Sequence, residues 1–187
     1  KKLAGLEDAL NKKIIGQAEA THLVAAAVKR SRVHTSNLHR PASFIFVGPT
    51  GVGKTELVKV LSEQLFDTPE TLIRLDMSEF MEKHSVSRII GAPPGYVGYR
   101  DEGALTGRIL SRPRSVVLFD SAECAHPDVF PLIRRILESG FLDDSSGRRC
   151  DFGNRCGSII RFGITDRFGC INRLGGTNGY GCAVYLG

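Results

Sequence analysis

Residues 48–55 read Gly48-Pro49-Thr50-Gly51-Val52-Gly53-Lys54-Thr55 and match the phosphate-loop pattern G-x-x-x-x-G-K-[ST] at every fixed position. An apolar run at 43–47 precedes them and predicts a buried strand, and 56–61 predicts a helix. Glycines let backbone N–H groups curl round an anion, and the helix N-terminus adds partial positive charge beneath it. The stretch therefore predicts an ATP site formed by all eight residues. Lys54 would contact the β- and γ-phosphates, and the Thr55 hydroxyl would bind Mg²⁺.

Length and composition indicate a globular chain. Its 187 residues suit one domain, or one domain with part of a second, and 42% of them are hydrophobic and 24% charged. No apolar run approaches the length of a membrane span, and the N-terminus lacks a secretory apolar region. We therefore expect a cytoplasmic location and no membrane partner.

The net charge of +5 is concentrated near the end of the chain, because residues 145–187 hold six arginines and two aspartates. A basic surface can bind nucleic acid. However, the sequence shows no aromatic–basic interleaving and no helix-turn-helix, so a solvated or subunit-facing surface is favoured and no nucleic-acid partner is expected. The five cysteines include no C-x-x-C pair, which favours reduced thiols over a disulfide framework or a zinc site.

Along the chain, apolar spacing predicts helices and strands that alternate. The expected helices cover 3–12, 18–32, 84–90, 102–111 and 127–139, and the further strands cover 71–76 and 115–120. Ser78 is a candidate helix cap after the strand at 71–76, and residues 91–99 are too rich in glycine and proline for a regular element. The alternation predicts an α/β fold with a parallel sheet and with nucleotide at the carboxyl ends of its strands.

Asp120 ends the apolar strand at 115–120. With a phosphate loop upstream, a carboxylate in this position is expected to be the second magnesium-coordinating group of the site and so a catalytic residue. The alternative is an aspartate that only caps a turn or a helix.

Residues 14–151 resemble the second ATPase module of the Clp-type AAA+ unfoldases and disaggregases. The resemblance lies in residues 15–17, 46–57, 76–87, 91–99, 116–120 and 125–130. It implies a three-layer AAA+ sandwich whose parallel sheet is flanked by helices. It divides the chain into a large ATPase subdomain at 1–162, with adenine-pocket helices at 1–40 and a phosphate-loop core at 41–162. Residues 163–187 would be a divergent tail rich in glycine, and the family's helical lid would be absent.

The resemblance also implies roles for residues outside the phosphate loop. Ile14 and Ile15 would line the adenine pocket, and Tyr96 with Val97 would grip a polypeptide passing through the pore of a ring. The expected function is ATP-driven threading of unfolded or aggregated polypeptides. The expected partners are those polypeptides, ring neighbours in a homo- or hetero-hexamer, and a peptidase or an adaptor.

The sequence departs from the family after Asp120, where Ser121 stands in place of a glutamate that polarises the attacking water. A hydroxyl cannot take a proton from water at neutral pH, so we expect tight ATP binding with slow or negligible hydrolysis. Glu123 follows two positions later, but the family carries a carboxylate there as well. The alternative function is therefore a hydrolysis-deficient nucleotide-binding scaffold or regulatory subunit.

The C-terminal part of the chain also departs from the family pattern. Residues 158–162 are expected to form a strand, with Thr165-Asp166 nearest to the family's γ-phosphate sensor. The segment 170–174 is similar to the family's arginine-finger segment, which would make Arg173 a catalytic residue in a neighbour's site. It arrives too early in the chain for the family pattern, and chance similarity is the alternative. Seven glycines in 163–187 predict weak order.

Overall fold

The protein is described here by a computed structural model, which covers residues 3–33, 41–49, 51–66, 71–92, 103–112, 114–153, 160–164 and 182–185. The α-helices are α1 (Leu6–Lys13), α2 (Ala18–Val33), α3 (Lys54–Phe66), α4 (Ser85–Ile90), α5 (Thr106–Ser111) and α6 (Phe130–Ser139). The short 3-10 helices given for the described residues are η2 (Met77–Phe80), η3 (Ala122–Cys124) and η4 (Pro127–Val129). The strands are β1 (Ser43–Val47), β2 (Leu72–Asp76), β3 (Val116–Asp120), β4 (Phe141–Asp143), β5 (Arg149–Asp151), β6 (Ile160–Ile164) and β7 (Cys182–Tyr185).

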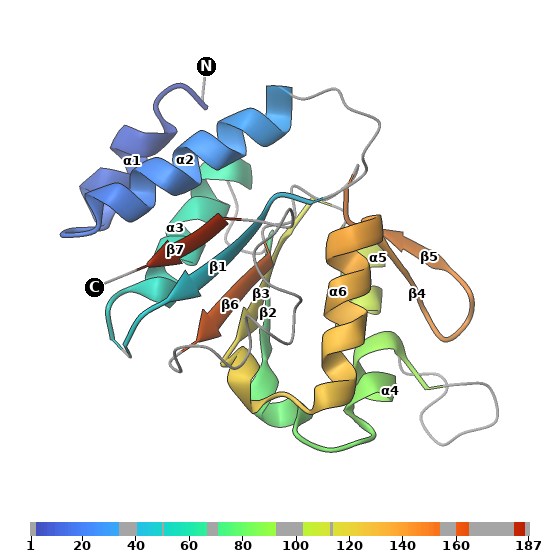
Figure 1. The fold of residues 1–187 in the computed structure, drawn as a ribbon. Helices are drawn as coiled ribbons and strands as arrows, with labels where there is room; N and C mark the ends of the chain where they lie inside the picture. The colour runs from blue at the N-terminus through green and yellow to red at the C-terminus, as the bar shows by residue number, and fades with distance from the viewer. Residues whose placement is uncertain are drawn as a thin grey trace.

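Five strands form one parallel sheet in the order β2-β3-β6-β1-β7. Helices α1, α2 and α3 lie on one side of this sheet, and α4, α5 and α6 lie on the other (Figure 1). The antiparallel pair β4 and β5 follows α6 at the edge of the second helical layer. The expected three-layer α/β sandwich with a parallel sheet is confirmed.

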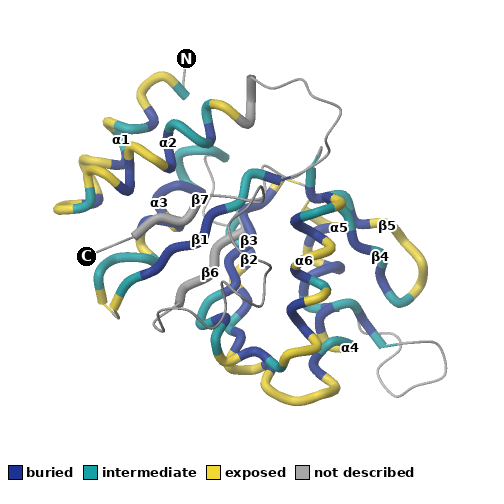
Figure 2. Tube along the Cα trace, viewed as in Figure 1, coloured by how far each residue is buried: buried dark blue, intermediate teal, exposed yellow. Residues whose placement is uncertain are grey.

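Alternation along the central strands divides the core into two clusters of buried side chains. Most of β1 is coloured as buried in Figure 2. On β1, Phe44 and Phe46 belong to the cluster that packs under α1–α3, whereas Ile45 and Val47 belong to the cluster under α4–α6. β3 alternates in the same way, and four of its five residues are buried. Successive side chains of a strand point to opposite faces, so a strand covered on both faces must be apolar throughout. This requirement explains the continuous apolar runs in the sequence.

Most of the expected helices are present, with shifted boundaries. α6 ends at Ser139, and Gly140, with a left-handed φ of 74°, caps it as the sequence indicated. The expected start at Pro127 belongs to η4, and α6 itself begins at Phe130. The helix expected at 102–111 is shorter, since α5 spans six residues. The prediction that Ser78 caps a helix is wrong. Asp76 is the cap of η2, and its carboxylate accepts the Ser78 N–H at 3.0 Å.

The tail contributes two strands to the sheet. β6 begins at Ile160 and ends at Ile164, slightly later than the strand expected at 158–162, and it lies between β1 and β3. β7 pairs with β1 on the other side, in parallel register from Phe44↔Cys182 to Val47↔Tyr185. The sequence pattern does not predict β7. The boundary expected at residue 162 between the ATPase subdomain and the tail therefore falls inside β6. The glycine-rich tail contributes β7, the edge strand next to β1.

The turn between β4 and β5 is organised by Asp144, which is 8% exposed. Its carboxylate accepts the N–H groups of Ser146 and Arg148, at 2.9 and 2.7 Å, and the Arg148 Nε at 2.7 Å. Burial by itself would raise the pKa of Asp144. The hydrogen bonds from Arg148 and Ser146, together with the Arg148 charge, outweigh burial, so the pKa of Asp144 lies below its ordinary value.

Replacing Asp144 with alanine is expected to lower the free energy of unfolding by about 1–3 kcal/mol at pH 7, because backbone donors in the turn lose their acceptor. A lowered pKa in the folded state gives stability that is present above the unfolded pKa of about 3.9 and is lost as pH falls through the folded pKa. The difference between wild type and variant should therefore shrink below about pH 4. Urea denaturation at pH 7 and at a series of acidic pH values measures this. A difference that stayed constant with pH would contradict the assignment.

Candidate functional site

The phosphate loop connects β1 to α3, as its pattern predicted. Gly51 and Gly53 take left-handed φ values of 89° and 94°, which an L side chain rarely adopts. A Cβ built on either glycine would meet nothing within 4 Å, so open space lies beside the loop. α3 begins directly at Lys54, and the first N–H groups of a helix have no intrahelical acceptor. Loop and helix together offer an anion site of the expected kind.

Lys54 lies at the first position of α3 and folds back over the loop. Its ammonium Nζ donates to the carbonyl oxygens of Gly48 and Pro49, at 2.6 Å each. A lysine in this arrangement is already placed over the loop. A phosphate that draws the ammonium away would replace these two contacts with hydrogen bonds in which the acceptor is charged as well as the donor.

Asp120 ends β3, with its side chain 15% exposed. β3 is separated from β1 by β6 alone, so Asp120 and the phosphate loop both lie at the carboxyl ends of strands in the same parallel sheet. Ligands of open parallel sheets bind outside the carboxyl ends of the strands. Thr55 follows Lys54 on α3 and supplies a hydroxyl. A hydroxyl and a carboxylate, together with nucleotide phosphates, are donors that suit Mg²⁺, so the residues present fit the metal.

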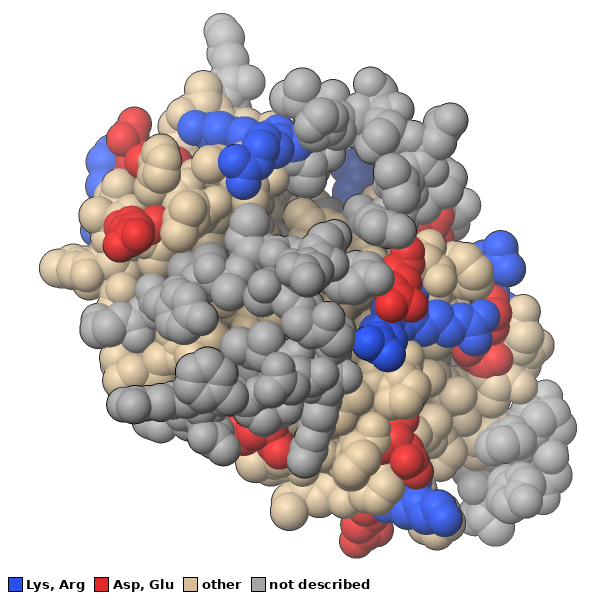
Figure 3. Space-filling model, viewed as in Figure 1, with Lys and Arg blue, Asp and Glu red and all other residues tan. Residues whose placement is uncertain are grey.

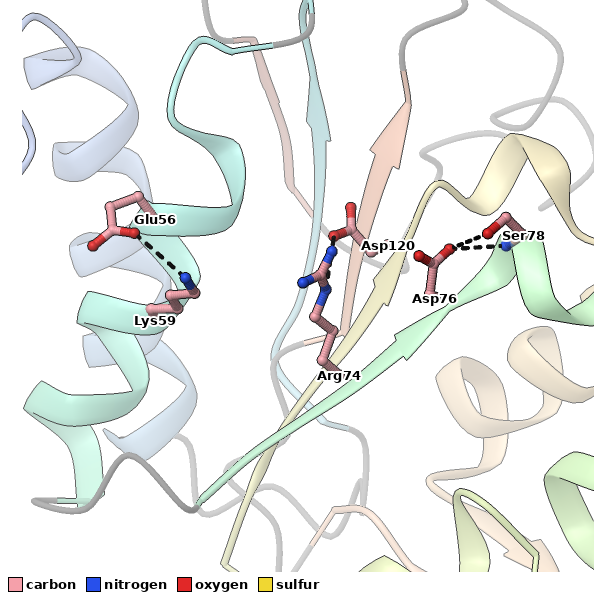
Figure 4. A network of polar contacts seen from close by, with 6 residues as sticks. All are labelled: Glu56, Lys59, Arg74, Asp76, Ser78 and Asp120. Atoms are coloured by element: carbon pink, nitrogen blue, oxygen red, sulfur yellow. Dashed lines mark hydrogen bonds and ion pairs between the residues drawn. The ribbon is translucent and has the colours of Figure 1, made fainter.

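Two residues beside Asp120 were not singled out from the sequence. Asp76 is the register partner of Asp120 at the end of β2. Hydrogen bonds from the Ser78 hydroxyl and N–H hold the pKa of Asp76 below its ordinary value. Arg74 lies on the same strand and contacts Asp120 through Nε at 3.0 Å and Nη2 at 2.8 Å (Figure 4). The sequence does contain a pattern that could have indicated these two residues. Residues 74 and 76 alternate with the apolar residues of the strand, so their side chains share one face of the sheet.

Ser121 directly follows Asp120 and adopts φ 55° and ψ 48°, the only non-glycine residue with positive φ among the described residues. Its hydroxyl makes no capping hydrogen bond to η3. Such backbone conformations are uncommon for residues other than glycine and asparagine, and they gather at functional sites. Glu123 lies within η3 and is half-buried.

The two isoleucines expected in the adenine pocket lie in different surroundings. Ile14 is 7% exposed and packs in the core with Leu6 and Leu10, whereas Ile15 is 91% exposed. Gln17 links this segment to the phosphate loop, since its Nε2 lies 3.5 Å from the carbonyl oxygen of Val52. The junction of α1 and α2 is therefore adjacent to the loop. The role of the two isoleucines towards adenine is not tested by these contacts.

Several residues with expected roles lie outside the described part of the chain. They are Thr50 of the phosphate loop, the pore-loop residues Tyr96 and Val97, the sensor candidates Thr165 and Asp166, and Arg173. Their roles stay predictions.

Charged side chains on the face shown in Figure 3 are of both signs. At the β4–β5 pair, for example, Arg135 and Arg149 contact Asp143 at 2.6 and 3.4 Å and lie over the Phe141 ring.

In the described ranges, no group of three or more His, Cys, Asp or Glu side chains is placed to hold a metal ion. None of the described helices is both long enough and apolar enough to cross a bilayer.

Comparisons with known proteins agree with this geometry. The family model described as "AAA domain (Cdc48 subfamily)" matches residues 39–156. The chaperone protein ClpB of Pseudomonas putida and that of Leptolyngbya boryana are each 58% identical to this chain over 154 residues, and ClpB of Vibrio cholerae is 54% identical. Each alignment covers 82% of this chain and 18% of the relative, so the chain spans less than a fifth of the length of these curated relatives.

A solved structure shows the same fold over nearly the whole chain. The structure is a closed-state cryo-EM reconstruction of Hsp104 with ATPγS and FITC-casein, and it matches with a TM-score of 0.82 and 32% sequence identity. The match covers 99% of this chain and 35% of the Hsp104 chain. The phosphate loop, the parallel sheet with Asp120 at its edge and these similarities lead to one conclusion: the chain belongs to the Clp-type AAA+ ATPases.

Proposed function

We propose that this chain is the ATP-binding module of a protein unfoldase or disaggregase. The observation that supports this most is the joint placement of Lys54 over the phosphate loop and of Asp120 at the carboxyl edge of the same sheet. In this proposal the phosphates bind at residues 48–55, and Lys54 contacts the β- and γ-phosphates. Thr55 and Asp120 hold Mg²⁺, which neutralises phosphate charge when it is bound.

The proposed hydrolysis is slow, and the chain's own residues give the reason. A general base must accept a proton from the attacking water, and Ser121 offers a hydroxyl where the resemblance places a carboxylate. This observation favours a second candidate function, in which the chain binds ATP as a scaffold or regulatory subunit of a mixed ring. The two candidates share the nucleotide site and differ only in turnover.

The proposed partners follow from the family. The proposed substrates are unfolded or aggregated polypeptides, gripped by Tyr96 and Val97, and the ring neighbours would receive Arg173 as a catalytic residue in their own sites. A peptidase or adaptor and a cytoplasmic location belong to the same proposal. The Hsp104 structure was determined with ATPγS and FITC-casein, a nucleotide analogue and a polypeptide, which supports these classes of ligand.

Titration of the chain with ATP, with and without Mg²⁺, tests the proposed function. Calorimetry should show saturable binding of one nucleotide per chain, and removing Mg²⁺ with EDTA should weaken it. Asp120→Asn should weaken binding in Mg²⁺ and leave binding in EDTA unchanged, because the substitution removes a metal ligand and no phosphate contact. Binding that did not respond to Mg²⁺ or to Asp120→Asn would contradict the proposed metal site.

A further inference from the structure

The contact between Arg74 and Asp120 has an uneven geometry. Nε and Nη2 of Arg74 both contact the same carboxylate oxygen, Oδ2, at 3.0 and 2.8 Å. Figure 4 shows that the other oxygen of Asp120 points away from Arg74. One oxygen is thus held by the guanidinium, and the other, at the carboxyl end of β3, is turned away from it.

The sheet explains why Arg74 reaches Asp120. Arg74 and Asp76 are two residues apart on β2 and so share one face, and Asp76 is opposite Asp120 in the parallel register. Arg74 is therefore the diagonal neighbour of Asp120, within reach of a long side chain. Its own strand fixes its backbone, since Ile73 and Leu75 on either side of it are buried in the core. The guanidinium thus extends from a rigid base.

We propose that Arg74 is a positioning residue for Mg²⁺: by holding Oδ2 of Asp120, it aims Oδ1 at the metal. This inference rests on the proposed function and deepens it. Carboxylates that bind metals are themselves commonly held by hydrogen bonds from an outer layer of residues, and removing such a partner costs about 10–100-fold in metal affinity or activity. The planar guanidinium suits the task because its donors approach one oxygen in a fixed geometry.

Stability is a poor alternative explanation for this ion pair. The Arg74 side chain is 52% exposed and Asp120 is 15% exposed, so solvent screens the guanidinium and the pair contributes less to folding than a fully buried one. Competition is the other alternative, in which the guanidinium occupies the metal's place and must leave before Mg²⁺ can bind. The two ideas predict opposite signs: removing Arg74 weakens metal binding if it positions Asp120 and strengthens metal binding if it competes.

The test compares Arg74→Gln and Arg74→Lys with the wild-type chain. The affinity for Mn²⁺, used as a paramagnetic probe in place of Mg²⁺, is measured by EPR in the presence of a non-hydrolysable ATP analogue, and nucleotide affinity is measured separately in EDTA. We expect Arg74→Gln to weaken Mn²⁺ binding about 10-fold, and Arg74→Lys to weaken it less, because one ammonium can still hold Oδ2. Nucleotide affinity in EDTA and the melting temperature should stay at wild-type values.

A matched control and a double variant sharpen the test. Arg135 forms a similar half-exposed pair with Asp143 at 2.6 Å, remote from the site, and Arg135→Gln should leave Mn²⁺ affinity unchanged. In an Asp120→Asn background, Arg74→Gln should have no further effect on Mn²⁺ affinity, because Arg74 acts only through Asp120.

Unchanged or tighter Mn²⁺ binding by Arg74→Gln, with normal binding by wild type, overturns the positioning role and leaves the proposed function standing. A wild-type chain that binds no nucleotide overturns both. If Arg74→Gln does not fold, Arg74→Lys decides: metal affinity weaker than wild type with unchanged affinity in EDTA supports the role, and wild-type metal affinity overturns it.

Discussion

Replacing Lys54 with alanine is expected to weaken ATP binding at least about 100-fold, a loss of about 2.7 kcal/mol. The ammonium lies over the phosphate loop on the carbonyls of Gly48 and Pro49, from which it can turn to the phosphates. Hydrogen bonds to charged groups contribute about 1.5–3 kcal/mol. Without the lysine, the bound phosphate would also lose its positively charged partner, which weakens binding further. Calorimetric titration with ATP and Mg²⁺ measures the change.

Lys59 provides the control on the same helix. It is exposed and forms a pair with Glu56 at 3.8 Å, one turn further along α3. Lys59→Ala should leave ATP affinity within about twofold of wild type, because an exposed helical pair contributes only a few tenths of a kcal/mol. Equal losses for the two variants would mean that Lys54 acts through general charge and makes no specific phosphate contact.

Replacing Ser121 with glutamate is expected to raise steady-state ATP turnover by about 100-fold, the lower end of what a positioned general base contributes. Ser121 follows Asp120 immediately, so a longer carboxylate there begins at the edge of the nucleotide site. The left-handed backbone, with φ 55°, already carries a side chain and would carry the new one at similar cost. ATP affinity should stay near the wild-type value, because no phosphate ligand changes.

Glu123→Gln distinguishes the possible outcomes for Ser121. If the wild-type chain hydrolyses ATP at a substantial rate and Glu123→Gln abolishes it, Glu123 has become the base. A substantial wild-type rate that survives Glu123→Gln would contradict the loss of the base altogether. A rate that stays negligible in Ser121→Glu would favour the scaffold or regulatory function.

Much of the fold could be predicted because it depends on local patterns. Phe44 to Val47 and Val116 to Phe119 are apolar on both faces, and only a strand buried between two helical layers requires that. The left-handed Gly140 ended α6 where the sequence indicated. The phosphate loop was equally clear, since its glycines and Lys54 stand at fixed spacings.

What the sequence did not reveal depends on long-range pairing. β7 is a short edge strand between glycines, and its partner β1 lies far away in the chain, so no local period marks it. The contact of Arg74 with Asp120 depends on parallel register, which sets residues 44 positions apart opposite each other on β2 and β3. The prediction for Ser78 fails for a local reason: serine and aspartate are both favoured N-caps, and Asp76, two residues earlier, holds the position.

A structure of this chain with a non-hydrolysable ATP analogue and Mg²⁺ tests the central claim most directly. We expect the phosphates to lie within hydrogen-bonding distance of the loop and of the first N–H groups of α3. We also expect Lys54 Nζ to leave the carbonyls of Gly48 and Pro49 for the phosphates, with Asp120 facing the metal. A nucleotide bound elsewhere, with Lys54 still on those two carbonyls, would contradict the proposed ATP site.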